Sequence, residues 1–373
     1  MSVAGNSSSS LQVKTMERLG PVSATWDHLA DSQPLPSPFM KSWWIDNIAS
    51  GSLAILCFFD GTELVGGAAF ELDAVRVGPL KVERVRCVGQ GVLAPDHLDI
   101  LAADSHRSAV VDATLKWLRR PGSRIVDLDG LASRGGLAGA LDSHVVDRIP
   151  APFASLPSEG PTYLADRPGT LRSTVKRGRN RFAKAGVSFS RTPPSDVERS
   201  LDSLAELHDG RWSEESEFLH AFDRFRVAAA AGAKSGDVLI HELSSETTGV
   251  VAVELDLLAG QRICFYQAGR RTEREWRGCG TVLRADLIDL ICQEDRTEYD
   301  MLRGDEPYKS DWATSERSLL RCRFGVGPLG KALIVGANAW KRSQPTLHRL
   351  RSYVRRTVSR VPWSPRRESR IEM

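Results

Sequence analysis

The chain has 373 residues, of which 41% are hydrophobic and 26% charged, and its formal net charge is +3. This length suits two or three domains, and the balance of apolar and charged residues is that of a soluble globular protein. No apolar run approaches the roughly 20 residues that a membrane-spanning helix needs, which argues against such a helix.

The six cysteines and eight histidines are scattered along the sequence. None of the cysteines has the C-x-x-C spacing, and no histidines have the spacing of a zinc site. Free thiols in a reducing compartment are therefore expected, with neither a disulfide framework nor a metal site. Charge is unevenly placed, because residues 341–373 hold ten Lys or Arg against two Glu. The folded body is mildly acidic and the C-terminal tail is strongly basic.

The first part of the chain predicts a disordered lead and one α/β unit. Residues 1–19 begin with MSVAGNSSSS, which lacks the basic and apolar stretches of a secretory signal. The following unit, 20–150, has a helical pattern with two tryptophans at 42–50. Residues 54–72, AILCFFDGTELVGGAAFEL, predict two strands joined by a polar turn. A helix over 105–118 and a strand over 123–128 complete this unit.

A proline-rich segment separates the two halves of the sequence. Residues 148–161, RIPAPFASLPSEGP, contain four prolines and show neither a helical nor a strand period. This pattern predicts an interdomain linker, placed at 151–161. The next segment, 170–186, predicts a basic helix that ends at Gly186. Its charges form either a solvated face or a surface that attracts an anionic ligand.

The second unit, 162–328, repeats the pattern of the first. Residues 237–255 align with 54–72 at a constant offset of 183, with six identities in nineteen positions. The repeat predicts two copies of one α/β unit, with substrate bound between them. The predicted elements of the second copy are helices over 201–211 and 215–231, strands over 237–243, 249–257 and 262–269, a helix over 281–293 and a strand over 299–302.

An arginine-rich loop, 270–281, joins the third of these strands to the next helix and reads RRTEREWRGCGT. Gly278 and Gly280 let the backbone approach a ligand closely, and the first amides of the helix have no partner within it. Together with the helix dipole, such amides are typical of a site for phosphate or pyrophosphate. The alternative is a glycine-rich turn with solvated arginines.

The segment 299–312, YDMLRGDEPYKSDW, gathers acids, a tyrosine, a lysine and a tryptophan after a short strand. Loops at strand ends often carry functional side chains. The alternative is a salt-bridged loop packed by Tyr308 and Trp312.

The order of elements in the second unit resembles the GNAT acyltransferase fold. Residues 275–280, EWRGCG, resemble the pyrophosphate loop of that family, with Glu275 where Gln or Arg is usual. Residues 302–309, LRGDEPYK, with Trp312, resemble bacterial acetyltransferases of the CelD type, found near polysaccharide-synthesis genes. Those proteins, like the Fem-type transferases, contain tandem GNAT-like units. The resemblance implies an α/β (α+β) fold of two such units, each with a mixed, mostly antiparallel sheet flanked by helices.

The resemblance also implies acetyl-CoA as co-substrate, no metal, and direct attack of an amine on the thioester. In catalysis, Tyr308 would be the acid for the leaving thiolate, Asp305 the base or an anchor for the amine, and Tyr266 a contact to substrate or thioester. The substrate-binding candidates are Lys309, Trp312, His208 and Arg303. The coenzyme candidates are Arg274, Arg277, Gly278, Gly280 and Thr281. Glu254 is a further candidate base, although a structural role is favoured for it, because Glu71 occupies its place in the first unit.

The tail, 329–373, contains an amphipathic pattern over 344–361 with arginines on the polar faces. This pattern suits an anionic membrane surface, a docked helix or a disordered segment. Nucleic acid is not expected as a partner, because aromatic stacking positions are lacking.

The function predicted from the sequence is acyl-CoA-dependent N-acetylation of an amino group on a sugar or another envelope or polysaccharide precursor. The expected location is the cytoplasm, or the inner face of the cell membrane. Two alternatives stay open: a non-catalytic scaffold for polysaccharide assembly, and a Fem-like transferase that uses an aminoacyl-tRNA.

Overall fold

The computed structural model describes residues 11–77, 79–157, 162–212 and 217–337. The amphipathic pattern over 344–361 lies outside these residues. None of the helices in the described ranges is long and apolar enough to cross a membrane.

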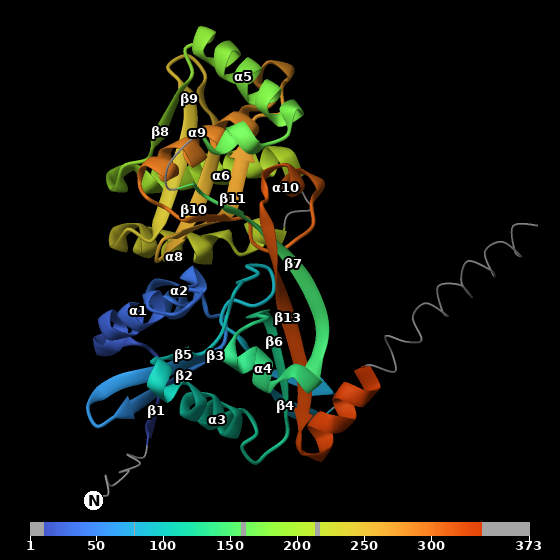
Figure 1. The fold of residues 1–373 in the computed structure, drawn as a ribbon. Coiled ribbons are helices and arrows are strands. Elements are labelled where there is room, and N and C mark those ends of the chain that lie inside the picture. The colour runs from blue at the N-terminus through green and yellow to red at the C-terminus, as the bar shows by residue number, and fades with distance from the viewer. Residues whose placement is uncertain (1–10, 78, 158–161, 213–216, 338–373) are drawn as a thin grey trace, which may run out of the picture.

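One mixed sheet runs through the described residues and joins both units (Figure 1). Its strand order is β1-β2-β3-β4-β6-β13-β7-β12-β11-β10-β9-β8, with β5 paired to β3. The β4/β6 and β11/β12 pairs are parallel, and the other pairs are antiparallel. The strands are β1 (Gln12–Met16), β2 (Ser52–Asp60), β3 (Glu63–Val77), β4 (Leu80–Cys87), β5 (Leu101–Ala102), β6 (Arg124–Ala132), β7 (Val145–Ser155), β8 (Ser188–Arg191), β9 (Val238–Ser245), β10 (Gly249–Ala259), β11 (Arg262–Arg270), β12 (Glu298–Asp300) and β13 (Ser315–Val326).

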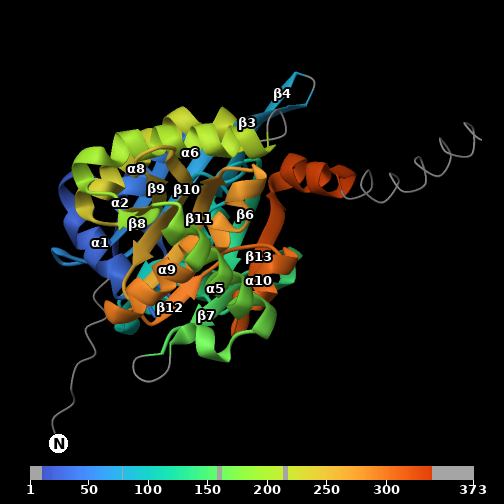
Figure 2. The same cartoon turned by 90° about the horizontal axis from the view of Figure 1, so that it is seen from above.

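Helices cover both faces of this sheet. In the second unit, α5 and α9 lie on one face and α6 and α8 on the other, as the view from above shows (Figure 2). The tandem, mostly antiparallel α/β fold expected from the sequence is confirmed. The helices are α1 (Ser23–Asp31), α2 (Ser42–Ile48), α3 (Arg107–Leu118), α4 (Gly136–Ala140), α5 (Gly169–Lys184), α6 (Val197–Trp212), α7 (Glu217–His220), α8 (Phe222–Ser235), α9 (Cys279–Gln293) and α10 (Pro307–Trp312).

The two units share one hydrophobic core. Helix α2 packs against α8, and a Cβ atom at Gly232 of α8 would lie 2.8 Å from the ring of Trp43. The rings of Phe39 and Trp44 lie 5.7 Å and 6.0 Å from the ring of Tyr266 on β11. Because interiors are packed closely, this continuous core holds the units in one arrangement.

The proline-rich segment is a strand, so the linker expected at 151–161 is wrong for residues 151–155. These residues belong to β7, which pairs with β13 on one side and β12 on the other. The carbonyls of Pro150 and Pro152 accept hydrogen bonds from the amides of Gly304 and Met301. The missing N–H of each proline therefore lies on the side facing residues 301–304, where β7 contributes carbonyl acceptors. The hydrogen bonds between β7 and β13, on the other side, do not require these two N–H groups.

Other boundaries also differ from those expected. Residues 12–16, assigned to a disordered lead, form β1 and pair with β2. The single helix expected over 215–231 is divided, with α8 beginning after Ala221. The two units are not cleanly separated in sequence, because β13 of the second unit pairs with β6 of the first. The hydrophobic periodicity of the sequence does not reveal pairing between strands that are so far apart in the chain.

Candidate active site

A cleft of about 750 Å³ opens on the face of the second unit that carries α5 and α9. Its floor is formed by β10 and β11, its sides by α5 and α9, and its end by α10. We call it the α9 cleft, defined by residues of α5 (Thr174, Arg177, Arg181), β10 and β11 (Glu254, Phe265, Ala268, Arg270), the start of α9 (Arg277, Gly278, Gly280, Thr281, Arg284) and α10 (Tyr308, Asp311, Trp312).

The cleft exists because β11 and β12 separate. The two strands pair in parallel only from Arg262/Glu298 to Cys264/Asp300, and β11 then continues to Arg270 without β12 beside it. The register between β10 and β11 shifts between Leu255 and Asp256, which makes a bulge in β11. After the parallel stretch, Phe265 lines the cleft and the next residue, Tyr266, does not.

The glycines of the arginine-rich loop bring the backbone to the cleft. Gly278 caps α9 with a φ of 85°, in the left-handed region that favours glycine. At Gly280, a Cβ atom would lie 3.3 Å from the Arg270 side chain. Helix α9 has 15 residues, and the N–H groups of Thr281 and Val282 donate to the carbonyl oxygen of Gly278. The N–H groups of Cys279 and Gly280 have no carbonyl partner among the described residues and lie at the positive end of the helix dipole. The mouth of the cleft can therefore accept an anion.

Arginine side chains surround this helix start. The guanidinium groups of Arg177, Arg270 and Arg277 have no hydrogen bond or ion pair with the residues that the structure describes. Arg181 donates a hydrogen bond to the carbonyl oxygen of Arg277, which ties α5 to the loop. Unpaired arginines beside a helix start are suited to bind phosphate groups through two N–H donors each.

A buried ion pair lies under the inner part of the cleft. Glu254 is 1% exposed and accepts hydrogen bonds from Nη2 of Arg284, at 3.1 Å, and from the hydroxyl of Tyr299. Burial raises the pKa of Glu254, while Arg284 and Tyr299 act in the opposite direction. The guanidinium carbon of Arg284 lies 4.2 Å from the centre of the Phe265 ring and 5.3 Å from that of Tyr308.

Six of the predicted catalytic, substrate-binding and coenzyme residues line the α9 cleft: Tyr308, Trp312, Arg277, Gly278, Gly280 and Thr281. Burial raises the pKa of Tyr308, so its hydroxyl stays protonated at neutral pH. Asp305 and Arg274 are exposed and do not line the cleft. Glu275 is also exposed and outside the lining, so its departure from the family pattern adds no negative charge there.

Tyr266 and His208 lie on the opposite face of the sheet, which corrects their assignment to the site. The Tyr266 hydroxyl donates to the carbonyl oxygen of Leu93 at 2.9 Å, and its ring packs on Phe225 of α8. His208 is buried on α6 with its ring 5.3 Å from that of Phe218. Both side chains take part in the core between the units.

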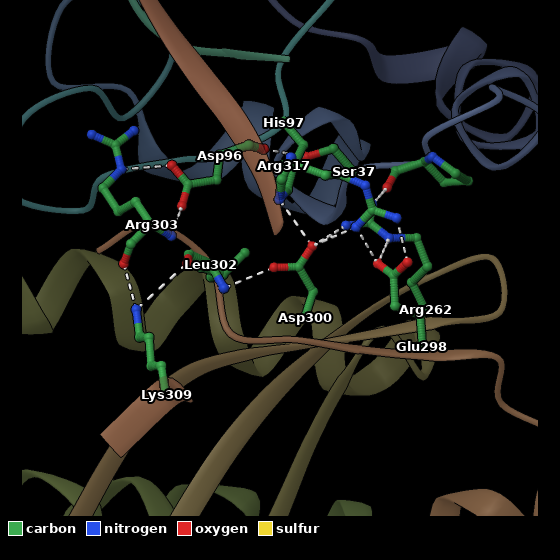
Figure 3. Close-up of polar contacts among 11 residues, drawn as sticks. Ser37, Asp96, His97, Arg262, Glu298, Asp300, Leu302, Arg303, Lys309 and Arg317 are labelled. Carbon is green, nitrogen blue, oxygen red and sulfur yellow. Dashed lines mark hydrogen bonds and ion pairs between the residues drawn. The ribbon is translucent and has the colours of Figure 1, made fainter. Parts of the chain in front are cut away.

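Arg303 and Lys309 have structural roles, which corrects their assignment to substrate binding (Figure 3). Arg303 donates to Asp96 at 2.6 Å and to Asp129 at 3.1 Å, so it joins the two units. The buried ammonium group of Lys309 donates to the carbonyl oxygen of Arg303 and pairs with Glu306 at 2.9 Å. These bonds fix the turn that positions α10.

The same polar network continues through Asp300 at the end of β12 (Figure 3). Asp300 accepts from Arg262 and from the amide of Leu302, and its Oδ2 lies 2.9 Å from Nε2 of His97 in the first unit. Burial alone would raise the pKa of Asp300, but His97 and Arg262 hold it below its ordinary value. An ionised Asp300 therefore connects the two units beneath the turn.

Sequence reasoning missed several residues of the cleft. Arg284 and Phe265 lie within apolar runs, where nothing separates them from core positions. Arg177 and Arg181 belong to the basic helix whose charges, from the sequence, form either a solvated face or a surface for an anionic ligand. The structure places these two arginines beside the loop, because α5 approaches α9 at Gly178, where a Cβ atom would lie 2.5 Å from Val282.

Residues 169–310 match the family model described as Acetyltransferase (GNAT) domain. The chain contains a GNAT acetyltransferase-like domain. The matched region begins with α5 and includes the α9 cleft through most of α10. None of the curated proteins matches the sequence. The finer resemblance to acetyltransferases of the CelD type stays a prediction.

Solved structures share the fold over both units. FemX has a TM-score of 0.59 at 10% identity, covering 83% of this chain and 96% of its own. A conserved protein of unknown function from Bacteroides thetaiotaomicron has a TM-score of 0.53 at 10% identity. This match covers 83% of this chain and 99% of that protein's chain. L-PGS from Bacillus licheniformis has a TM-score of 0.50 at 13% identity, and the match covers 76% of this chain and 85% of the L-PGS chain. At these identities, the likeness establishes the fold.

Proposed function

We propose that the chain is an acyltransferase that takes an acyl group from coenzyme A and transfers it to an amine. The observation that carries this proposal is the charge at the mouth of the α9 cleft. Arg177, Arg270 and Arg277, unpaired among the described residues, surround the start of α9. A pyrophosphate group satisfies both the helix amides and the guanidinium groups.

The rest of the cleft suits the remainder of such a donor. The gap along β11 is lined by Phe265 and Ala268 and gives an extended, partly apolar arm a path into the fold. Its inner end meets Glu254, Arg284 and Tyr308. A thioester brought to this end would meet groups that can move protons.

In the proposed reaction, the amine nitrogen attacks the thioester carbonyl carbon, so that a C–N bond forms and the C–S bond breaks. Tyr308 gives its hydroxyl proton to the leaving thiolate, because its raised pKa keeps that proton in place until then. Glu254 takes the proton of the attacking amine, directly or through water, since burial makes it a stronger base. This role replaces the one expected for Asp305, which is exposed outside the cleft.

Calorimetry with acetyl-CoA tests the donor, and release of free thiol in the presence of an amine library tests the transfer. The expected result is binding of acetyl-CoA and thiol release with a subset of amines. The proposal fails if acetyl-CoA produces no heat of binding at millimolar concentration. The acceptor is proposed to be an amino sugar or another envelope or polysaccharide precursor, in the cytoplasm. Binding of acetyl-CoA without turnover on any amine would favour a non-catalytic scaffold.

A second candidate, transfer from an aminoacyl-tRNA, is favoured by the surface of α5. Arg177 and Arg181 of this helix line the cleft, and Arg172 and Lys176 lie in a separate hollow of the same helix with Arg179. Five basic side chains of the helix are exposed: Arg172, Lys176, Arg177, Arg181 and Lys184. This surface exceeds what one pyrophosphate needs and suits a larger polyanion. The distinguishing result is transfer from charged tRNA with acetyl-CoA inert.

A further inference from the structure

A second cleft of about 880 Å³ lies where the first unit meets the start of β13. We call it the β13 cleft. It is bounded by the turn 97–100, the start of α3, the segment 132–136 and strands β7 and β13. It shares none of its lining residues with the α9 cleft. A ligand bound there would therefore be a different molecule, or a different part of one.

The lining of the β13 cleft is rich in arginine. It contains Arg107, Arg134, Arg148 and Arg317, against the carboxylates of Asp99 and Glu316. Asp99 is already engaged, because it accepts hydrogen bonds from the amides of Gly136 and Leu137 at 2.8 Å each. Its charge is thus partly compensated inside the protein.

The arginines of the β13 cleft differ in how they are held. Arg317 pairs with Glu298 and lies over the ring of Phe153, with 3.7 Å between the guanidinium carbon and the ring centre. Arg134 and Arg148 are exposed, and their guanidinium groups have no partner within the described ranges. Arg107 is held as well, because it pairs with Asp104 and donates to the carbonyl oxygen of Ala102. Two arginines of the cleft are therefore fixed, and two at its rim are available to an incoming oxyanion.

One ring nitrogen of a buried histidine in the lining also lacks a partner among the described residues. His97 is 1% exposed, with Nε2 turned to Asp300, and its Nδ1 has no hydrogen-bond partner among the residues that the structure describes. A buried polar atom without a partner costs about 1–3 kcal/mol. The φ of 57° at His97 adds backbone strain, since this region disfavours residues other than glycine.

We propose that the β13 cleft is a second binding site, which takes a small polar molecule carrying a phosphate or carboxylate group. The oxyanion binds the guanidinium groups of Arg134 and Arg148 at the rim. Behind them, the buried wall contains His97, whose Nδ1 has no hydrogen-bond partner among the described residues. This assignment does not rest on the nature of the acyl donor, because the two clefts share no residues.

Calorimetry on the full chain tests this site with two probes, glycerol 3-phosphate and succinate, which distinguish a phosphate from a carboxylate ligand. We expect one of them to bind, and the double variant Arg134→Ala/Arg148→Ala to weaken that binding at least about tenfold. The matched control is Arg76→Ala, since Arg76 is an exposed arginine of β3 outside the lining. The control should bind as the unaltered chain does.

The variant Arg277→Ala separates this site from the α9 cleft. It should leave probe binding unchanged, while Arg134→Ala/Arg148→Ala should leave acetyl-CoA binding unchanged. The proposal is overturned if neither probe binds at millimolar concentration. It is equally overturned if Arg76→Ala or Arg277→Ala weakens probe binding as much as the double variant does, because the effect would then be one of general charge.

Discussion

Glu254 and Arg284 form an ion pair at the floor of the α9 cleft, with 3.1 Å between Oε2 and Nη2 and side-chain exposures of 1% and 8%. Both charges are removed from water, so each depends on the other for compensation. The pair joins β10 to α9 and lies directly below the aromatic residues of the cleft. It therefore connects the stability of the GNAT-like domain with the chemistry proposed for it.

The variant Glu254→Gln tests both roles of this pair. It leaves the Arg284 charge buried without its partner, so we expect the free energy of unfolding to fall by about 3 kcal/mol. Thiol release should fall about 100-fold or more, because the proposed base is lost. Chemical denaturation and steady-state kinetics measure the two effects. The matched control is Glu246→Gln, at an exposed position of the β9–β10 turn, and it should change neither.

Tyr308→Phe removes only the hydroxyl of the proposed acid. Because Tyr308 is 39% exposed, the free energy of unfolding should change by less than about 0.5 kcal/mol. The rate of thiol release at saturation should fall about 100-fold, while acetyl-CoA affinity is kept. Full turnover by this variant would remove Tyr308 from the mechanism and leave the donor site intact.

Arg277→Ala and Arg274→Ala compare two arginines of one loop. Arg277 lines the α9 cleft, and Arg274, also exposed, does not. Losing a charged donor to phosphate should weaken acetyl-CoA binding about tenfold in Arg277→Ala, whereas Arg274→Ala should bind normally. Calorimetry at two salt concentrations measures the acetyl-CoA affinity of both variants. Equal losses in both variants would contradict the placement of pyrophosphate at the cleft mouth.

Gly178→Ala tests the contact between α5 and α9. The added Cβ atom would lie 2.5 Å from Cγ2 of Val282, so α5 must move away from α9. We expect a loss of about 1 kcal/mol in the free energy of unfolding, together with weaker acetyl-CoA binding. Gly139→Ala in α4 is the control, because no atom lies within 4 Å of its added Cβ. Thermal denaturation should show that the control is neutral or slightly more stable.

The buried pair of His241 and Asp256, 3.1 Å apart, predicts a pH dependence of stability. Burial raises the pKa of Asp256 to about 8 and lowers that of His241 to about 4. Between about pH 4 and 6.5, the native pair holds one proton on Asp256 and the unfolded chain holds one on its histidine, so the two effects cancel.

Above pH 6.5 the unfolded chain releases its proton, while the native pair keeps one until about pH 8. The native state then binds more protons than the unfolded state, so stability falls as pH rises through this window. Denaturation at pH 6.5 and pH 8 should show a loss of about 1–2 kcal/mol. In Asp256→Asn the loss over this window should be absent, and an equal loss in that variant would exclude Asp256 as its source.

The sequence by itself determined the local elements and the loop at the mouth of the cleft. Helix α9, hairpin β9–β10 and strand β11 follow from apolar periods and from turn residues that act over a few positions. The same holds for the turn at Gly278 and Gly280, because it lies between a strand and a helix that are both visible in the sequence. These features depend on neighbours in the chain, which the sequence displays directly.

Only the tertiary structure decided which side chains line the clefts. Phe265 and Tyr266 are adjacent, yet the β11 bulge and the separation of β12 place one in the α9 cleft and the other in the core between the units. Arg303 and Lys309 look like ligand-binding residues until their partners are known, and Asp96 lies more than two hundred positions from Arg303. The prolines of β7 likewise indicate a linker until β13 is paired beside them. Each outcome depends on contacts between distant segments, and local periodicity carries no information about such contacts.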